Sequence, residues 1–198
     1  MKPGALLAND RAAAGAEFAL VLPILLLCLF GIIDAGRFMW NINRAEKAAQ
    51  MGVRMAVVTD YVSSEIGDDY VGECTPAVDA GEPIPEDCYP TITCNKVGGT
   101  TTCTPVGGTA DGAAFDVIVN RMRAFMPEIQ PENVEITYSP SGLGYAGDPN
   151  GADLAPLVTV RLSGVPFEPM MFLRFASVGL PEVRSSLTFE DGIGSESN

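Results

Sequence analysis

The most constraining feature of the sequence is an apolar run from Ala12 to Ile33, in which Glu17 is the one ionisable residue. At about 1.5 Å per helical residue, the 22 residues of this run reach roughly 33 Å, and the hydrocarbon core of a bilayer is about 30 Å thick. The run therefore predicts a transmembrane helix. A carboxylate within a membrane segment is costly and usually has a partner or a function, so Glu17 is the first candidate functional residue.

Three other interpretations of this run are open. It could be a removable secretory signal with Lys2 and Arg11 as its basic region, although Asp34-Ala35-Gly36-Arg37 makes a poor cleavage site. It could be the core helix of a soluble protein, although few soluble folds bury so much Leu and Ile without interruption. It could also be a plain anchor whose Glu17 reaches the membrane interface.

The helix is expected to continue beyond the membrane and to cover residues 13–58, because Gly36 and Gly52 are the only helix breakers after the apolar run. Within the run, Pro23 is expected to kink the helix. Small or apolar residues recur in the second half at spacings of three and four: Ala45, Ala48, Ala49, Gly52, Met55 and Ala56. Such a stripe permits close approach, either by the protein's own sheet or by a neighbouring helix.

Charge divides the chain into two unlike parts. Residues 1–59 carry a net charge of +2, whereas residues 60–198 carry −15. The acidic part argues against binding to nucleic acid or anionic lipid through a basic patch, because phosphate would be repelled. Basic residues lie on both sides of the apolar run, so their distribution alone does not orient it in the membrane.

Cysteine usage indicates the compartment. Cys28 lies in the apolar run, and four others lie in a Gly-, Pro- and Thr-rich segment over residues 63–111, which is expected to be a long loop without a core to bury them: Cys74, Cys88, Cys94 and Cys103. Two disulfides, and hence an oxidising compartment outside the cytoplasm, are the natural interpretation. Zinc is disfavoured because the chain has no Cys-x-x-Cys pair and no histidine. Three connectivities are open, and the local pairs Cys74–Cys88 and Cys94–Cys103 are favoured.

The remaining sequence predicts a small α+β domain. Residues 113–126 have the apolar spacing of a short helix, which Pro127 ends. Apolar and polar residues alternate around residues 134–138, 158–162 and 183–189, as expected for an antiparallel sheet with one face covered by a helix. Residues 170–176 could add a helical turn between the last two strands.

No chemistry of catalysis is evident, and no cofactor is expected. The chain lacks histidine, the commonest general base, and contains no nucleophile elbow, phosphate loop or dinucleotide fingerprint. The acidic pairs Asp68-Asp69 and Glu86-Asp87 are interpreted as solvated charges in loops. Asp148, Asn150 and Asp153 form part of a calcium-loop pattern, which a simple turn explains equally well.

The segment Arg11-Ala12-Ala13-Ala14-Gly15-Ala16-Glu17-Phe18-Ala19-Leu20-Val21-Leu22-Pro23, with the later Phe30-Gly31 and Asp34-Ala35-Gly36-Arg37, resembles the TadE-like family. These are pilin-like proteins of the tight adherence (Tad) pilus system. The resemblance is dense over residues 11–58. Further along, Val158-Thr159-Val160 and Pro166-Phe167-Glu168-Pro169 are similar to the end of such proteins.

This resemblance implies processing and assembly roles for particular residues. Prepilins are cut by a membrane aspartic peptidase five residues before a conserved glutamate, which implies a cut between Ala12 and Ala13. Family leaders generally end in Gly, where this chain has Ala12. Glu17, followed by Phe18 and Pro23, would then pair with the new α-amino group of a neighbouring subunit and fix the stagger between helices.

The expected organisation is a leader over residues 1–12, a long helix over 13–58, and an extracytoplasmic domain over 59–198 with a disordered tail at 191–198. The expected function is that of a minor pilin or assembly component in the bacterial inner membrane. Its expected partners are other pilin-like subunits, the assembly machinery and a prepilin peptidase. The alternative is a membrane-tethered extracytoplasmic binding module that is not a pilin.

Overall fold

A computed structural model describes residues 10–105, 108–147, 153–169 and 178–189, with the side chains described from residue 14 onward. Most of the predicted leader lies outside these residues. The predicted helical turn at 170–176 and the predicted tail at 191–198 lie entirely outside them. The chain divides into two compact units. Unit 1 contains residues 1–41 and 166–178, and unit 2 contains residues 42–165 and 179–198.

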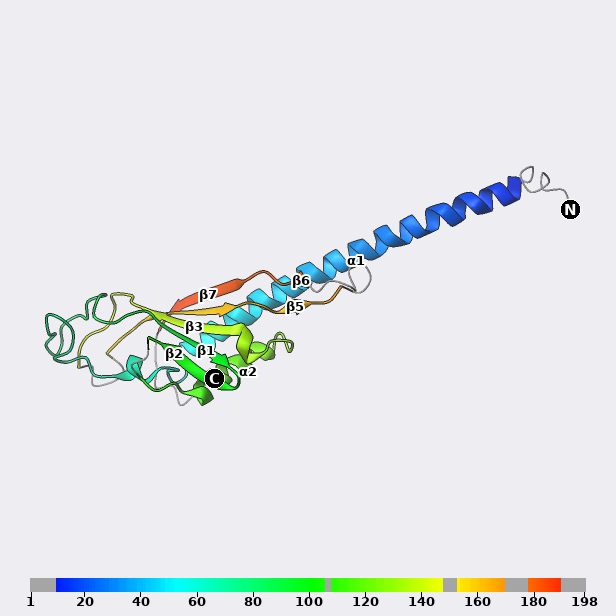
Figure 1. The fold of residues 1–198 in the computed structure, drawn as a ribbon. Helices are drawn as coiled ribbons and strands as arrows, with labels where there is room; N and C mark the ends of the chain where they lie inside the picture. The colour runs from blue at the N-terminus through cyan, green and yellow to red at the C-terminus, as the bar shows by residue number, and fades with distance from the viewer. Residues whose placement is uncertain (1–9, 106–107, 148–152, 170–177, 190–198) are drawn as a thin grey trace. The chain divides into compact units, whose positions relative to one another are not determined.

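Unit 2 is built on a five-stranded antiparallel sheet, which confirms the expected α+β class (Figure 1). The strand order is β2-β1-β3-β4-β7. The bounds are β1 Ile92–Val97, β2 Thr100–Thr104, β3 Val134–Ser139, β4 Leu157–Leu162 and β7 Val183–Thr188. The three strands predicted from alternation are β3, β4 and β7, and in β3 every second residue is buried.

Two α-helices contribute to the core of unit 2. The long helix α1 covers Asp10–Ala56, close to the predicted 13–58. Helix α2 covers Gly112–Arg123, where the side chain of Asp111 accepts hydrogen bonds from the backbone N–H groups of Ala113 and Ala114. It ends three residues before the predicted Met126, and the chain continues in tight turns to Pro127. Two short 3-10 helices are also present: η2 Ser64–Gly67 comes after α1, and η3 Pro131–Asn133 comes after α2.

The predicted loop at residues 63–111 is wrong for part of its length, because β1 and β2 form a hairpin within it. Gly98 and Gly99 make the turn, and both have positive φ angles, 59° and 83°, as a tight hairpin requires. β1 pairs with β3 on its other side, so this hairpin joins the central sheet. Cys94 on β1 and Cys103 on β2 are both buried, so the expectation that this segment has no core to bury its cysteines is wrong for this pair.

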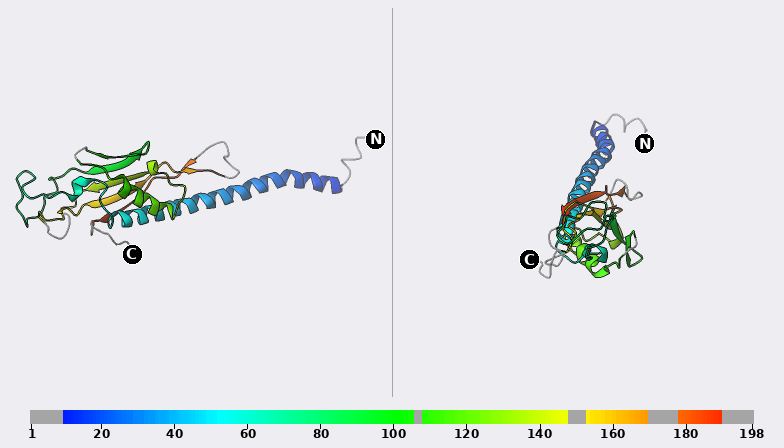
Figure 2. Two further views of the ribbon diagram at one scale, coloured as in Figure 1. Left: turned by 90° about the horizontal axis from the view of Figure 1, so that it is seen from below. Right: turned by 90° about the vertical axis from the view of Figure 1, so that its left-hand side faces the viewer.

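A second, smaller core lies among the loops of unit 2. Its buried members are Tyr70, Val78, Ile84, Tyr89, Ala146 and Leu154, with Cys74 and Cys88 packed against them. We call this cluster and the described loop residues 68–90, 141–147 and 153–154 the lobe. The loops lie at the end of the sheet where β3 ends and β4 begins (Figure 2). The long cysteine segment therefore does bury some of its apolar side chains.

The outer face of the sheet carries short polar side chains in register. One row crosses all five strands: Thr104, Thr93, Thr137, Thr159 and Ser186. The hydroxyls of Thr159 and Ser186 are 2.8 Å apart. This face therefore has the polar character expected of an antiparallel sheet that is open to solvent on one side.

Unit 1 contains the first part of α1 and the strand β5 Pro166–Phe167, which pairs with β6 Val178–Gly179. The rings of Phe38 and Phe167 meet edge to face, with centroids 5.2 Å apart. The guanidinium of Arg37 lies 5.7 Å from the centre of the Phe167 ring and 3.5 Å from the carboxylate of Asp34. Asp34 is buried, and Arg37, which also lies over the Phe167 ring, pairs with its carboxylate.

Candidate functional site

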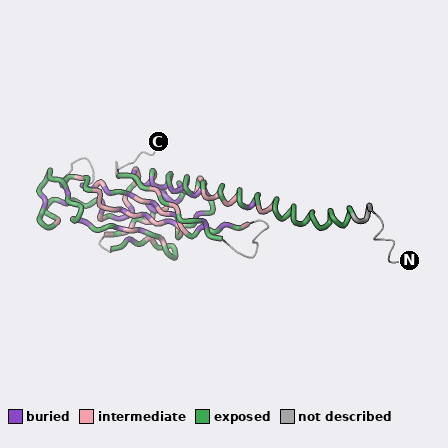
Figure 3. Tube along the Cα trace, turned by 90° about the horizontal axis from the view of Figure 1, so that it is seen from above, coloured by how far each residue is buried: buried purple, intermediate pink, exposed green. Residues whose placement is uncertain are grey.

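The first half of α1 exposes large apolar side chains around its whole circumference. Every described residue from 14 to 29 is exposed (Figure 3). Leu20 and Ile24 expose 73% and 66% of their surface. Pro23 lies within α1, which continues through it. Within the described residues, α1 is the one helix long and apolar enough to cross a membrane.

Glu17 lies on this exposed part of α1, next to Phe18, which is 65% exposed. Both side chains are accessible to a neighbouring molecule. The predicted cut between Ala12 and Ala13 falls within the helical backbone of α1. Processing at that position and pairing of Glu17 stay predictions.

The second half of α1 buries its small residues within unit 2. Ala48 and Ala56 have no exposed surface, and Ala45 and Ala49 expose 2% and 1%. A Cβ atom at Gly52 would lie 2.7 Å from Cγ of Met122 on α2 and 3.3 Å from Cγ1 of Val160 on β4. Of the two surfaces that could use the stripe, the structure therefore places the protein's own sheet and second helix against it.

Arg44 fixes this half of α1 beside the end of α2. Its Nε donates a hydrogen bond to the backbone carbonyl of Phe125, at 3.2 Å. Its two terminal nitrogens donate to the two carboxylate oxygens of Glu128, each at 3.3 Å. This bidentate arrangement fixes α1 against the segment that follows α2 as well as adding a charge pair.

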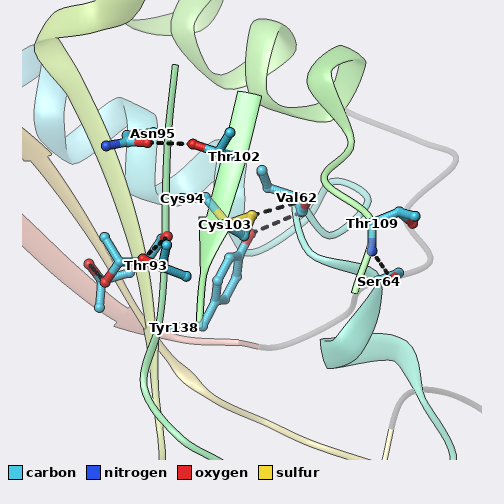
Figure 4. Close-up of a disulfide and its surroundings, with 11 residues drawn as sticks. Val62, Ser64, Thr93, Cys94, Asn95, Thr102, Cys103, Thr109 and Tyr138 are labelled. Carbon is cyan, nitrogen blue, oxygen red and sulfur yellow. Dashed lines mark hydrogen bonds between the residues drawn. A yellow bond between two sulfur atoms is a disulfide. The ribbon is translucent and has the colours of Figure 1, made fainter. Parts of the chain in front are cut away.

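The cysteines form the two local disulfides that the sequence analysis favoured, Cys74–Cys88 and Cys94–Cys103. The second one joins β1 to β2 at directly paired positions (Figure 4). Cys94 has no exposed surface and Cys103 exposes 8%. Cys28 is a free cysteine on the exposed part of α1.

Tyr138 lies beneath the hairpin disulfide, as Figure 4 shows. It has no exposed surface, and its hydroxyl accepts a hydrogen bond from the backbone N–H of Val62, at 3.2 Å. Burial raises the pKa of Tyr138 to about 12, against the lowering effect of that N–H group. The phenol is therefore neutral at physiological pH and serves to tie the segment after α1 to the sheet.

Asp153, which was considered as a calcium ligand, organises the lobe. It is 5% exposed, and its Oδ2 accepts hydrogen bonds from the backbone N–H groups of Tyr70 and Gly147, at 2.7 and 2.8 Å. Asp148 and Asn150 lie outside the described residues. Within the described part of the chain, no group of three His, Cys, Asp or Glu side chains could hold a metal ion.

One feature of the lobe was not predicted from the sequence. A pocket of about 490 Å³ lies over residues 65–90 and includes the pair Asp68-Asp69, which had been interpreted as solvated charge. Its carboxylates are close in sequence, but the tyrosines that form its walls come together only through the disulfide and the lobe core. The sequence signal available for this pocket was that an acidic residue directly precedes each of Cys74 and Cys88.

The family model described as TadE-like protein matches residues 12–54. The chain carries a TadE-like domain. The match covers both the exposed apolar segment of α1 and most of its buried small-residue stripe. No curated protein and no solved structure matches the chain.

Proposed function

We propose that this protein is a minor pilin or assembly component of a Tad-type pilus, anchored in the bacterial inner membrane by the first half of α1. The observation that carries the proposal is the coincidence of the TadE-like match at residues 12–54 with the exposed apolar segment at 14–29. Such an exposed surface is unfavourable in water and is stabilised in lipid or against other apolar helices.

The disulfides support an extracytoplasmic position for unit 2. Both pairs lie in unit 2, and disulfides persist in oxidising compartments such as the bacterial periplasm. The acidic surface and the polar outer face of the sheet suit an aqueous environment. Unit 2 therefore faces the periplasm in this proposal and the fibre exterior if the subunit enters the pilus.

Assembly in this proposal depends on Glu17. A prepilin peptidase cuts between Ala12 and Ala13, which leaves a positively charged α-amino group at the start of the mature helix. Glu17 of one subunit pairs with that group on its neighbour, because a carboxylate in lipid is strongly stabilised by a nearby cation. The pair sets the axial stagger of packed helices, while their apolar side chains supply most of the contact.

Two measurements test this proposal. N-terminal sequencing of membrane-derived protein is expected to begin at Ala13, whereas retention of Met1 or Lys2 would support the simple membrane tether. Glu17→Ala is expected to abolish co-assembly with other pilin-like subunits in a crosslinking assay of piliated cells. Glu46→Ala is the matched control, because Glu46 is an exposed carboxylate on the other half of α1. Normal piliation with the Glu17 variant would contradict the pairing role.

A further inference from the structure

The exposed apolar surface of α1 does not end where the apolar run of the sequence ends. One side of the helix continues it within unit 1, through exposed residues at spacings of three and four: Leu29, Ile32, Ile33, Gly36, Met39 and Trp40. Met39 is 58% exposed and Trp40 is 67% exposed. The surface therefore extends about two turns past the predicted span, which ends at Ile33.

The two charged residues in this stretch do not interrupt that surface. Between Phe18 and Trp40 they are Asp34 and Arg37. Asp34 is buried, and Nη1 of Arg37 lies 3.5 Å from its Oδ1. The guanidinium of Arg37 also lies over the ring of Phe167 on β5. The pair has no net charge, and such pairing lowers the cost of holding charged groups beside lipid.

The length of this surface fits a bilayer. Residues 18–40 reach roughly 34 Å at about 1.5 Å per helical residue. A tilt of about 20° leaves about 32 Å along the membrane normal, slightly more than the roughly 30 Å of hydrocarbon. Trp40 then lies just beyond the hydrocarbon, and Glu17 lies at its opposite edge. If residues 12–33 filled the hydrocarbon instead, Trp40 would lie about 10 Å outside it.

Trp40 has the chemistry of a residue at the membrane interface. An indole combines a large apolar ring with one N–H donor, and tryptophan is enriched where membrane helices meet the lipid headgroups. Arg37, whose side chain is 41% exposed, lies three residues earlier and can donate to a lipid phosphate. The sequence turns polar directly after Trp40, at Asn41, Asn43 and Arg44. Trp40 therefore marks the end of the apolar surface.

We propose that the lipid-contacting surface of α1 covers residues 18–40, and that Met39 and Trp40 bind the headgroup layer of the periplasmic leaflet. This inference rests on the proposed membrane anchoring of α1, and it does not depend on the pairing of Glu17. Phospholipid is the occupant because the surface is continuous with the exposed apolar segment and has the length of a bilayer. A neighbouring helix in its place would cover Trp40 with protein.

Trp40 is the single tryptophan of the chain, so its intrinsic fluorescence reports the depth of this residue alone. The full-length protein is reconstituted in phosphatidylcholine vesicles whose acyl chains carry bromine either near the headgroup end or near the tail end. The shallow bromines are expected to quench Trp40 at least about twofold more strongly than the deep ones. Iodide in the water is expected to quench Trp40 at least about twofold less than a tryptophan exposed on unit 2.

Two reference positions calibrate this measurement, each in a Trp40→Phe background. Leu25→Trp places the probe deep in the hydrocarbon whether the span is 12–33 or 18–40, so the deep bromines should quench it most. Val97→Trp places the probe at a position of unit 2 that is 68% exposed. Iodide should quench that probe strongly, and neither brominated lipid should quench it.

Flotation of the vesicles separates this inference from the proposed function. Protein that does not float with the vesicles would contradict the membrane anchoring and this inference with it. If the protein floats but iodide quenches Trp40 as strongly as it quenches the Val97→Trp variant, this inference alone is overturned. Quenching of Trp40 by neither agent would show that protein covers it, and strongest quenching by the deep bromines would place it in the hydrocarbon. Either result would overturn the inference.

Discussion

The two halves of α1 are both apolar, yet they are used in opposite ways. Residues 14–29 expose large side chains such as Leu20 and Ile24, whereas the stripe within residues 45–56 buries its alanines and places Gly52 against Met122 of α2 and Val160 of β4. Both belong to one continuous helix. Apolar content alone therefore does not tell which surface a helix segment meets.

Side-chain size explains the difference. Small residues allow the backbone of α1 to approach the sheet closely, and the neighbours Met122 and Val160 then fill the space that larger side chains would need. Leu and Ile in the first half leave no such groove and instead present a wide apolar surface. The first half is suited to a fluid or adaptable environment, and the second half to one fixed partner.

The largest expected effect concerns the glycine at the centre of the buried stripe. Gly52→Leu is expected to destabilise unit 2 by at least about 3 kcal/mol, because the new side chain overlaps Met122 and Val160. Gly36→Leu is the control on the same helix, since nothing lies within 4 Å of a Cβ atom there. Urea unfolding of the two variants in detergent measures the difference. Equal stability losses would show that the two halves do not differ in packing.

A charge in the exposed half should affect the membrane and leave unit 2 intact. Leu25→Arg is expected to make insertion of α1 less favourable by about 2.5–3.5 kcal/mol, which is the usual cost for Arg near the centre of a membrane helix. The fraction of protein that resists alkaline extraction from membranes measures this loss. Val97→Arg, at a position of unit 2 that is 68% exposed, should change neither extraction nor unfolding. Unaltered membrane retention of the Leu25 variant would contradict the view that the exposed half of α1 lies in the membrane.

The smallest expected effect concerns the ion pair that positions the buried half. Glu128→Gln removes the charge opposite Arg44 and is expected to lower the unfolding free energy by less than about 1 kcal/mol, because the Glu128 side chain is 52% exposed. The loss should shrink as salt is added. Glu132→Gln, at another exposed acid nearby, provides the reference. A loss of several kcal/mol would mean that charge pairing, rather than close packing, holds this half in place.

Much of the fold could be predicted because its signals are local. The 22-residue apolar run, the alternation in β3 and β4, and the small residues of α1 each follow a simple period in the sequence. The hairpin β1–β2 was missed although Gly98-Gly99 is a strong turn signal. Its strands are rich in Thr and Cys, so their alternation between buried and exposed positions is weak as an apolar pattern.

The lobe could not be predicted for a different reason. Its apolar residues, such as Tyr70, Val78 and Ile84, are spaced irregularly and meet residues from the distant loop that holds Leu154. Asp153 resembles a calcium ligand in the sequence because its spacing to Asp148 and Asn150 is visible there, whereas its bonds to backbone N–H groups are not. The pocket likewise depends on contacts that no local pattern encodes.

The separate core of the lobe has a consequence for how such a protein can change over time. A disulfide and a small apolar cluster hold the lobe without drawing on the side chains that stabilise the sheet. Regions with their own cooperative packing can open or vary without unfolding their neighbours. Substitutions can therefore accumulate in the lobe and alter its surface, while the sheet that carries it stays the same.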